Sequence, residues 1–130
     1  MKTTILKISE FLLLFSLIGT GCKKDATPLK NGKIVFYTNA QALLNCGPFN
    51  VDIFINDDLV GSISEPYVEV TYPECVNSNA TLLVEKKTGK YNYTAKMNCG
   101  QYGSWVDHVE VYSDSCVYVF LDMDDCIIKN

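Results

Sequence analysis

Apolar and polar side chains alternate with a period of two along most of the chain after residue 32. The clearest example is the segment FNVDIFIND, in which Val51, Ile53 and Ile55 share one face. Successive side chains of a β-strand point to opposite faces, so this pattern predicts a strand with one buried face. The alternation therefore constrains the chain to a β-fold before any other property is considered.

Seven further segments are predicted to be strands because β-branched, aromatic and other apolar residues recur in them at alternate positions. They are residues 33–38, 59–63, 67–72, 81–87, 91–97, 105–113 and 116–124. Gly, Asn, Asp and Pro separate them at spacings near ten residues, and a turn is expected at 56–58. These features are typical of a β-sandwich or barrel, and we predict an all-β fold, a single antiparallel β-sandwich of about seven to eight strands. The segment 39–45 (NAQALLN) is predicted to be a helical turn or loop between the first two strands.

The first residues have the features of a secretory signal peptide. Lys2 and Lys7 are basic, residues 11–18 form a short apolar run, and residues 19–21 are small. The run is too short to span a bilayer, which takes about 20 apolar residues. We therefore expect residues 1–21 to be removed on export.

The cysteine that follows this segment resembles the lipidated cysteine of a bacterial lipobox. Thr20, Gly21 and Cys22 fit the lipobox, whereas Gly19 departs from it, because Leu is usual at that position. A lipidated Cys22 would carry acyl chains, including a palmitate-type chain, that hold the protein on a membrane without spanning it. Residues 23–32 then form a polar tether. The alternative is cleavage by ordinary signal peptidase, which leaves Cys22 free or in a disulfide.

Charge excludes one large class of partner. The chain has 11 basic residues, all of them Lys, and 15 acidic residues. Removal of residues 1–21 takes away Lys2, Lys7 and Glu10. The mature chain then has 9 basic and 14 acidic residues, a net charge of −5. Nucleic-acid binders need clustered positive charge and rely on Arg for base and phosphate contacts. We therefore expect no nucleic-acid partner for this domain of about a hundred residues.

Six cysteines in a small exported chain predict disulfides. If Cys22 is lipidated, five remain, and we hypothesise that four pair among themselves while Cys126, in a loose C-terminal tail, stays free. The four disulfide candidates are Cys46, Cys75, Cys99 and Cys116. If Cys22 is not lipidated, six cysteines allow three bridges. No CxxC pair occurs and there is one histidine, so we predict no metal site and no cofactor at these cysteines.

Four segments together suggest a family: NCGPFNVDIFINDDLVGSI, YPEC, GKYNYTAKMNCG and SWVDHVEVYSDSCVYVFLD. They resemble small Bacteroidota-type lipoproteins with a single immunoglobulin-like or transthyretin-like β-sandwich. The resemblance covers residues 32–122 and implies a fold and an outer-membrane location, on the periplasmic face or the cell surface. The positions that carry it are Cys46, Cys75 after a Pro, the GxYxxxA set of Gly89, Tyr91 and Ala95, then Trp105 and Cys116. The acidic tail and Cys126 depart from it.

No catalytic site is predicted. His108 is the only histidine, and the chain contains no GxSxG nucleophile motif. Two groups of oxygen ligands, at 56–58 and at Asp122, Asp124 and Asp125, are of the kind that Ca²⁺ prefers. Neither group has EF-hand spacing, and a hairpin turn and a solvated tail explain them.

Four aromatic residues near one expected turn form a candidate ligand platform: Tyr91, Tyr93, Tyr102 and Trp105. A flat aromatic ring can pack on a sugar face while its polar rim forms hydrogen bonds. The competing interpretation is core packing, because aromatic side chains dominate sandwich interiors, and Trp105 shares its face with Val109 and Val111.

We therefore predict a cell-envelope lipoprotein that presents a disulfide-stabilised β-sandwich as a structural or binding surface, without catalysis. Its parts are a signal peptide (1–21), acylated Cys22 with a tether (22–32), the sandwich (33–124) and a tail (125–130). The first alternative is a carbohydrate- or peptide-binding accessory module of an uptake or adhesion system. The second is a soluble secreted domain with three disulfides, and the third is an enzyme or inhibitor subunit. The sequence leaves the oligomeric state open.

Overall fold

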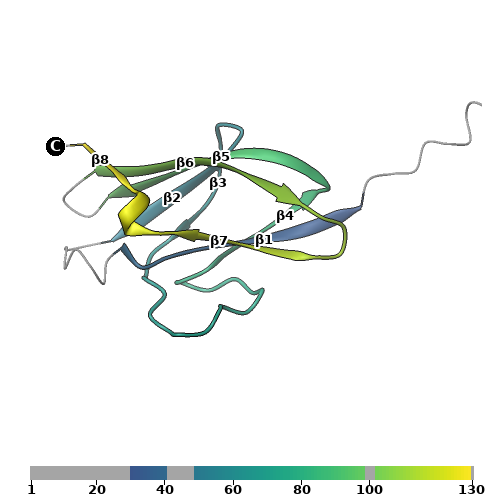
Figure 1. Ribbon diagram of the computed structural model, residues 1–130, viewed down its shortest axis with the longest axis horizontal. Coiled ribbons are helices and arrows are strands. Elements are labelled where there is room, and N and C mark those ends of the chain that lie inside the picture. Colours follow the sequence, from purple (N-terminus) through teal and green to yellow (C-terminus); the bar gives the residue numbers. More distant parts are fainter. Residues whose placement is uncertain (1–29, 41–48, 99–101, 130) are drawn as a thin grey trace, which may run out of the picture.

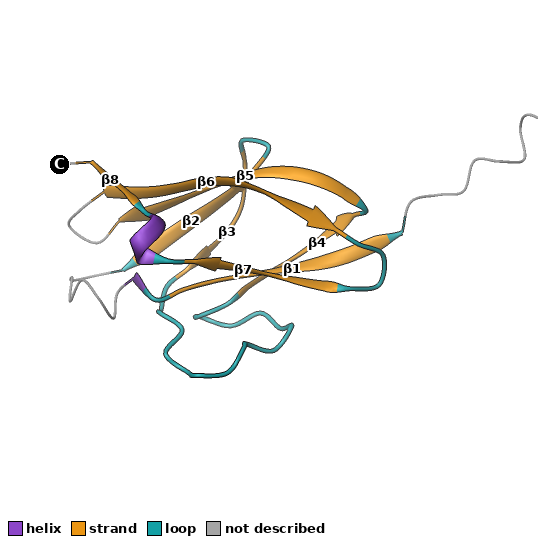
Figure 2. Cartoon of the chain, viewed as in Figure 1, coloured by secondary structure: helices purple, strands orange, loops and turns teal. Residues whose placement is uncertain are grey.

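The computed structural model describes residues 30–40, 49–98 and 102–129 and shows two β-sheets packed face to face (Figures 1 and 2). One sheet has the strand order β4-β1-β7, and the other has the order β3-β2-β5-β6-β8. The predicted all-β sandwich is confirmed. Its elements are β1 (Asn31–Thr38), β2 (Asn50–Ile55), β3 (Asp58–Ile63), β4 (Leu82–Lys87), β5 (Gly89–Asn98), β6 (Tyr102–Val111), β7 (Cys116–Leu121), the 3-10 turn η1 (Met123–Asp125) and β8 (Ile127–Lys129).

The hydrophobic core lies between the two sheets, where the alternating apolar side chains meet. Val51, Ile53 and Ile55 of β2 are buried, as their shared face predicts. Phe36 of β1 is fully buried, and its ring meets the edge of the Tyr93 ring of β5 at 5.4 Å between centroids. Burial of each such side chain contributes about 1.5–3 kcal/mol to folding. The period-two pattern therefore accounts for the core.

One pair of neighbouring strands is parallel. β1 pairs with β4 antiparallel and with β7 parallel, whereas the neighbours in the other sheet are all antiparallel. The backbone N–H of Lys33 donates to the Ser115 carbonyl at 2.8 Å, where β7 joins β1. The parallel pair arises because the chain leaves β6 in one sheet and enters β7 in the other, so the last long strand lies beside the first.

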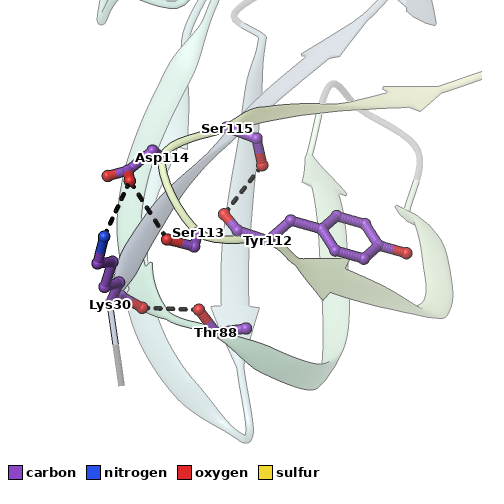
Figure 3. Close-up of polar contacts among 6 residues, drawn as sticks. All are labelled: Lys30, Thr88, Tyr112, Ser113, Asp114 and Ser115. Carbon is purple, nitrogen blue, oxygen red and sulfur yellow. Dashed lines mark hydrogen bonds and ion pairs between the residues drawn. The ribbon is translucent and has the colours of Figure 1, made fainter. Parts of the chain in front are cut away.

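The turn that carries the chain from β6 to β7 is held by local hydrogen bonds (Figure 3). The Ser115 hydroxyl donates to the Tyr112 carbonyl at 2.9 Å, and Asp114 has a positive φ of 54°. A Cβ atom at Gly32 would overlap the Tyr112 carbonyl oxygen, so glycine is required where β1 passes this turn. The Lys30 ammonium lies 3.8 Å from the Asp114 carboxylate, in an exposed ion pair that adds little stability.

The hairpin between β2 and β3 confirms the turn predicted at 56–58. Asn56 and Asp57 have positive φ values of 48° and 70°. Two successive positive φ angles are typical of a type I′ turn, and Asn and Asp tolerate them better than most residues. The β2–β3 register then shifts by one residue, which leaves Val60 as a bulge in β3.

The structure corrects several expectations about secondary structure. The strands expected at 105–113 and 116–124 end at Val111 and Leu121, and the second is followed by η1. Residues 67–72, predicted to be a strand, lie in a loop, and the Val70 side chain is fully exposed. This segment makes one ladder-like contact, from the Tyr67 N–H to the Thr38 carbonyl at 2.8 Å. Pro73, which lacks an N–H, follows it. The tail expected at 125–130 is not loose, because β8 pairs with β6 at residues 102–104.

Several predicted features lie outside the described residues. They are the signal peptide, Cys22, most of the tether and most of the 39–45 turn. Within the described part of the chain, no helix has the length and apolar character needed to cross a membrane.

Candidate ligand-binding site

The connection from β3 to β4 folds over the outer face of the three-stranded sheet, on the side opposite the five-stranded sheet (Figure 1). Its two ends meet, because the N–H groups of Ser64 and Glu65 both donate to the Asn79 carbonyl at 3.0 Å. A surface loop of this length whose ends are close is an Ω-loop, a class that is frequently functional. We refer to residues 65–79 as the Ω-loop.

A disulfide holds the Ω-loop against the sheet. It joins Cys75, in the second half of the loop, to Cys116 at the start of β7. Polar contacts hold the exit of the loop: the Ser78 and Thr81 hydroxyls lie 2.7 Å apart, and the Thr81 hydroxyl donates to the Val76 carbonyl at 2.9 Å. The loop is therefore shaped by one covalent bond and several hydrogen bonds, without regular secondary structure.

Five aromatic side chains meet between the Ω-loop and the sheet, and we call them the aromatic cluster. The parallel register places Tyr37 of β1 opposite Phe120 of β7, and their rings stack at 5.0 Å with an interplanar angle of 26°. Tyr67 meets Tyr37 edge-on at 5.4 Å, and Tyr72 lies 6.0 Å from Tyr118, measured between ring centroids. Tyr67 and Tyr72 come from the loop, and the other three come from the strands.

A pocket of about 400 Å³ opens within this cluster. It is lined by Tyr37, Asn39, residues 67–72 of the Ω-loop and Phe120. Tyr37 is buried within it, whereas Tyr72 is 79% exposed. No lysine is among the described residues that line the pocket. Pockets that bind small ligands commonly have this size and combine aromatic walls with a few polar groups.

The polar groups of the pocket are neutral or acidic. The Tyr67 hydroxyl donates to the Thr71 carbonyl at 2.9 Å, which closes the loop on itself. Asn39 accepts the Met123 N–H at 3.1 Å through Oδ1, which leaves its amide group as a donor. The pKa of Tyr37 is raised by burial and by the neighbouring phenols of Tyr72, Tyr67 and Tyr118. Glu69 supplies a carboxylate at the rim.

The residues that line the pocket include no nucleophile paired with a base. His108 lies on β6, outside the pocket, and its Nδ1 is 3.1 Å from the Asp107 carboxylate in an exposed pair. Among the described residues, no three His, Cys, Asp or Glu side chains converge as a metal site. Asp122 caps η1, because its Oδ1 accepts the Asp124 N–H at 3.1 Å. The structure thus gives the acidic groups turn and capping roles.

The four aromatic residues predicted to be a ligand platform do not form one surface. Tyr93 and Trp105 are only 7% and 5% exposed and belong to the core. The Trp105 indole N–H donates to the Asp122 carbonyl at 2.7 Å. Tyr91 is half-buried against the core, whereas the Tyr102 side chain is exposed at the surface. The physical reason is the pleat: Tyr91 and Tyr93 share the inward face of β5, whereas Tyr102 and Trp105 are three residues apart on β6 and point to opposite faces.

The cysteine predictions are answered in part. Cys75 and Cys116, both candidates, are bonded to each other, whereas Cys46, Cys99 and Cys22 lie outside the described residues. Cys126 has a free, half-buried thiol, and burial raises its pKa.

Sequence reasoning missed the aromatic cluster because its members come from β1, β7 and a segment whose pattern predicts a strand. One available signal was the segment EPYVEVTYPEC, in which two prolines and a cysteine bracket two tyrosines. No family model matches the chain, and no curated protein and no solved structure is detectably similar to it. The resemblance to small Bacteroidota-type lipoproteins therefore stays a prediction.

Proposed function

We propose that this protein is a cell-envelope lipoprotein, held on the outer membrane by acyl chains on Cys22, whose β-sandwich binds a neutral carbohydrate without catalysis. The observation that carries the proposal is the aromatic cluster, which a disulfide-linked loop keeps at the surface instead of in the core. The binding site is the pocket between the Ω-loop and β7.

The chemistry of the pocket favours a sugar over a charged ligand. A flat ring such as Tyr72, which is 79% exposed, can pack against the C–H face of a pyranose. Glu69 and Asn39 at the wall can accept and donate hydrogen bonds to hydroxyl groups. An anionic sugar would meet a carboxylate and no lysine among the described lining residues, so a neutral saccharide fits best.

The placement of the pocket suits a tethered protein. The predicted tether, residues 22–32, overlaps the start of β1 at Asn31, whereas Tyr37 lies near the other end of the same strand. Six residues of strand span roughly 20 Å, so the pocket would lie away from the anchored end of the domain. A saccharide could then reach it without contacting the lipid surface.

Isothermal titration calorimetry tests the ligand. The protein is expressed with its own N-terminus, purified from membranes in detergent, and titrated with cellohexaose, maltohexaose and mannohexaose. We expect at least one of these neutral hexasaccharides to bind, and Tyr72→Ala to weaken that binding about tenfold, or about 1.4 kcal/mol. Tyr102→Ala removes an exposed tyrosine outside the pocket and should leave the affinity unchanged. Absence of binding at millimolar concentrations, or equal binding by Tyr72→Ala, would overturn the carbohydrate proposal.

Mass spectrometry tests the anchor independently. The intact protein from its native membrane is alkylated without prior reduction. We expect a mass above that of the Cys22–Asn130 polypeptide by a diacylglyceryl group and further acyl chain, with one alkylated thiol. Cys22→Ser should release the domain from the membrane fraction. An unmodified mature chain would contradict the lipoprotein proposal and leave the sugar site to be judged on the calorimetry alone.

A further inference from the structure

The disulfide between Cys75 and Cys116 borders a second pocket, on the side of the bond away from the proposed sugar pocket. Both cysteines are half-buried, and both line an open pocket of about 710 Å³. Residues 30–33, Glu85, Asp114 and Ser115 form the rest of its lining, so it shares no lining residue with the sugar pocket. Exposed disulfides are reduced more readily than buried ones. A thiol can therefore reach this bond from solvent while the sandwich stays folded.

The charged groups of this second pocket balance one another. The Lys30 ammonium pairs with the Asp114 carboxylate at 3.8 Å (Figure 3). Lys33 lies between Glu85 and Cys116, which are its register partners on β4 and β7. Two lysines and two carboxylates give the lining a net charge of zero. The pocket therefore has no excess of negative charge that would repel a thiolate.

The part of the Ω-loop that forms a wall of the sugar pocket has few other attachments to the sheet. Among the described residues, no backbone hydrogen bond joins residues 68–75 to a strand. Three side chains of this segment are largely exposed and bury little apolar area: Val68, Val70 and Tyr72. The noncovalent contacts that remain are the Tyr72 ring beside Tyr118, at 6.0 Å between centroids, and the buried Pro73. The position of this wall is therefore expected to depend on the disulfide.

We propose that the Cys75–Cys116 disulfide is a redox switch for sugar binding, opened by a dithiol that enters the second pocket. This switch rests on the proposed function, because the sugar pocket is the site that it controls. In an oxidising environment the bond is closed, and residues 67–72 form one wall of the sugar pocket. Reduction releases the segment around Cys75, and the sugar pocket loses this wall.

The reaction is thiol–disulfide exchange. A thiolate of the dithiol attacks one of the two protein sulfurs, forms a mixed disulfide and displaces the other protein sulfur as a thiolate, which takes up a proton. The second thiol of the reductant, as a thiolate, then displaces the remaining protein sulfur, which is also protonated. The protein gains two electrons and two protons and carries two thiols, while the reductant leaves as a disulfide. Reoxidation by a disulfide follows the same steps in reverse.

Access to the bond is tested with millimolar dithiothreitol on the full chain in detergent, without denaturant. Alkylation and peptide mass mapping at intervals should show that Cys75 and Cys116 become thiols, at a rate that low concentrations of urea leave unchanged. Reduction by way of global unfolding would instead accelerate with urea, because urea lowers the free energy of unfolding. No reduction of the folded protein, or a rate that rises steeply with urea, would overturn the proposal.

Lys33→Trp tests whether the second pocket is the route to the bond. The substitution places a large ring beside Cys116 at an exposed position of β1, and it should slow reduction about tenfold. Lys96→Trp makes the same change at an exposed position of β5 outside the pocket and should leave the rate unchanged. Equal rates in the two variants would contradict entry through this pocket.

The position of the loop and the affinity for sugar are then measured separately. Reduction should speed proteolytic cleavage of the Ω-loop and should weaken binding of a hexasaccharide about tenfold, and reoxidation should restore both. Cys75→Ala combined with Cys116→Ala is the control for the other cysteines, because this variant should resemble the reduced protein and should not respond to dithiothreitol.

Unchanged cleavage of the loop after reduction, or unchanged saccharide affinity, would overturn the switch. An equal response to dithiothreitol in the double variant would assign the effect to another cysteine and would also overturn it. If no hexasaccharide binds the oxidised protein, the proposed function fails, whereas faster cleavage of the loop on reduction still supports release of the loop by a dithiol.

Discussion

The two faces of the three-stranded sheet are held in different ways. The inner face buries Ile34 and Phe36 completely against the five-stranded sheet. The outer face carries Tyr37 and Phe120 under a loop that depends on a disulfide and on polar contacts. On the inner face, apolar area removed from water is the main source of stability. On the outer face, Val35 and Tyr37 are also buried, and the disulfide adds a covalent constraint on the loop that covers them.

Under the proposed function, folding and binding depend on opposite sides of β1. Alternate residues of one strand serve the two purposes, because Phe36 points to the core and Tyr37 to the pocket. Substitutions on the inner face should therefore lower stability, whereas substitutions at the exposed rim of the outer face should change binding alone.

The largest expected loss of stability comes from Phe36→Ala. Removing a fully buried Phe leaves a cavity and should lower the free energy of unfolding by about 3–5 kcal/mol. Urea unfolding followed by circular dichroism measures this change. A loss below about 1 kcal/mol would show that the inner face is not the main source of stability.

The next largest loss is expected when the disulfide is removed by combining Cys75→Ala with Cys116→Ala. The bridge spans a sequence separation of 41 residues, and a loop of this size is worth about 2–4 kcal/mol through restriction of the unfolded chain. Limited proteolysis should cut the Ω-loop faster in this variant, while peptide bonds in β2 and β5 stay protected. If neither the free energy of unfolding nor the rate of cleavage in the Ω-loop changes, the loop keeps its position without the disulfide.

Alkaline pH should destabilise both faces, because the pKa of Tyr93 in the core and the pKa of Tyr37 on the outer face are both raised, chiefly by burial. Burial raises the pKa of Tyr93 from 10.0 to about 12, with smaller contributions from Asp107 and Asp125. Between these values the folded chain keeps a proton on Tyr93 that the unfolded chain loses, so the contribution of Tyr93 to stability is constant below pH 10 and falls as pH rises towards 12. Unfolding measured at intervals over this range should show a smaller decline in Tyr93→Phe. An identical decline in both proteins would assign the alkaline sensitivity to another group.

The smallest effect on stability is expected for Tyr72→Ala at the rim. Its side chain is largely exposed, so the free energy of unfolding should change by less than about 0.5 kcal/mol, even though sugar binding weakens. Thermal unfolding beside the unsubstituted protein checks this. A loss of about 2 kcal/mol or more would show that the aromatic cluster is structural and would remove the separation between the two faces.

The sequence predicted the sandwich because alternation and turn chemistry are local. The inner face of β2 was predicted by the alternation of Val51, Ile53 and Ile55. The hairpin was predicted by the turn residues Asn56 and Asp57. Pairing between distant strands has no such local signal. The parallel contact of β1 with β7 and the addition of β8 to β6 depend on which edges are free after the rest of the chain has folded.

The pocket proposed as a binding site was harder to predict from the sequence for the same reason. Tyr37 and Phe120 are 83 positions apart and are neighbours only through the β1–β7 register. Val68, Val70 and Tyr72 recur at alternate positions as in a strand, but no described strand pairs with this segment and Pro73 follows it, so it is a loop. Tyr93 and Trp105 were grouped as a platform by proximity in sequence, whereas the pleat directs both into the core.

The most direct test of the account is an NMR titration of the uniformly ¹⁵N-labelled chain with the three neutral hexasaccharides. The account predicts amide shift changes confined to the Ω-loop and to the residues around Tyr37 and Phe120, with β2, β5 and β6 unaffected. Shift changes centred on the five-stranded sheet, or none at millimolar saccharide, would contradict it.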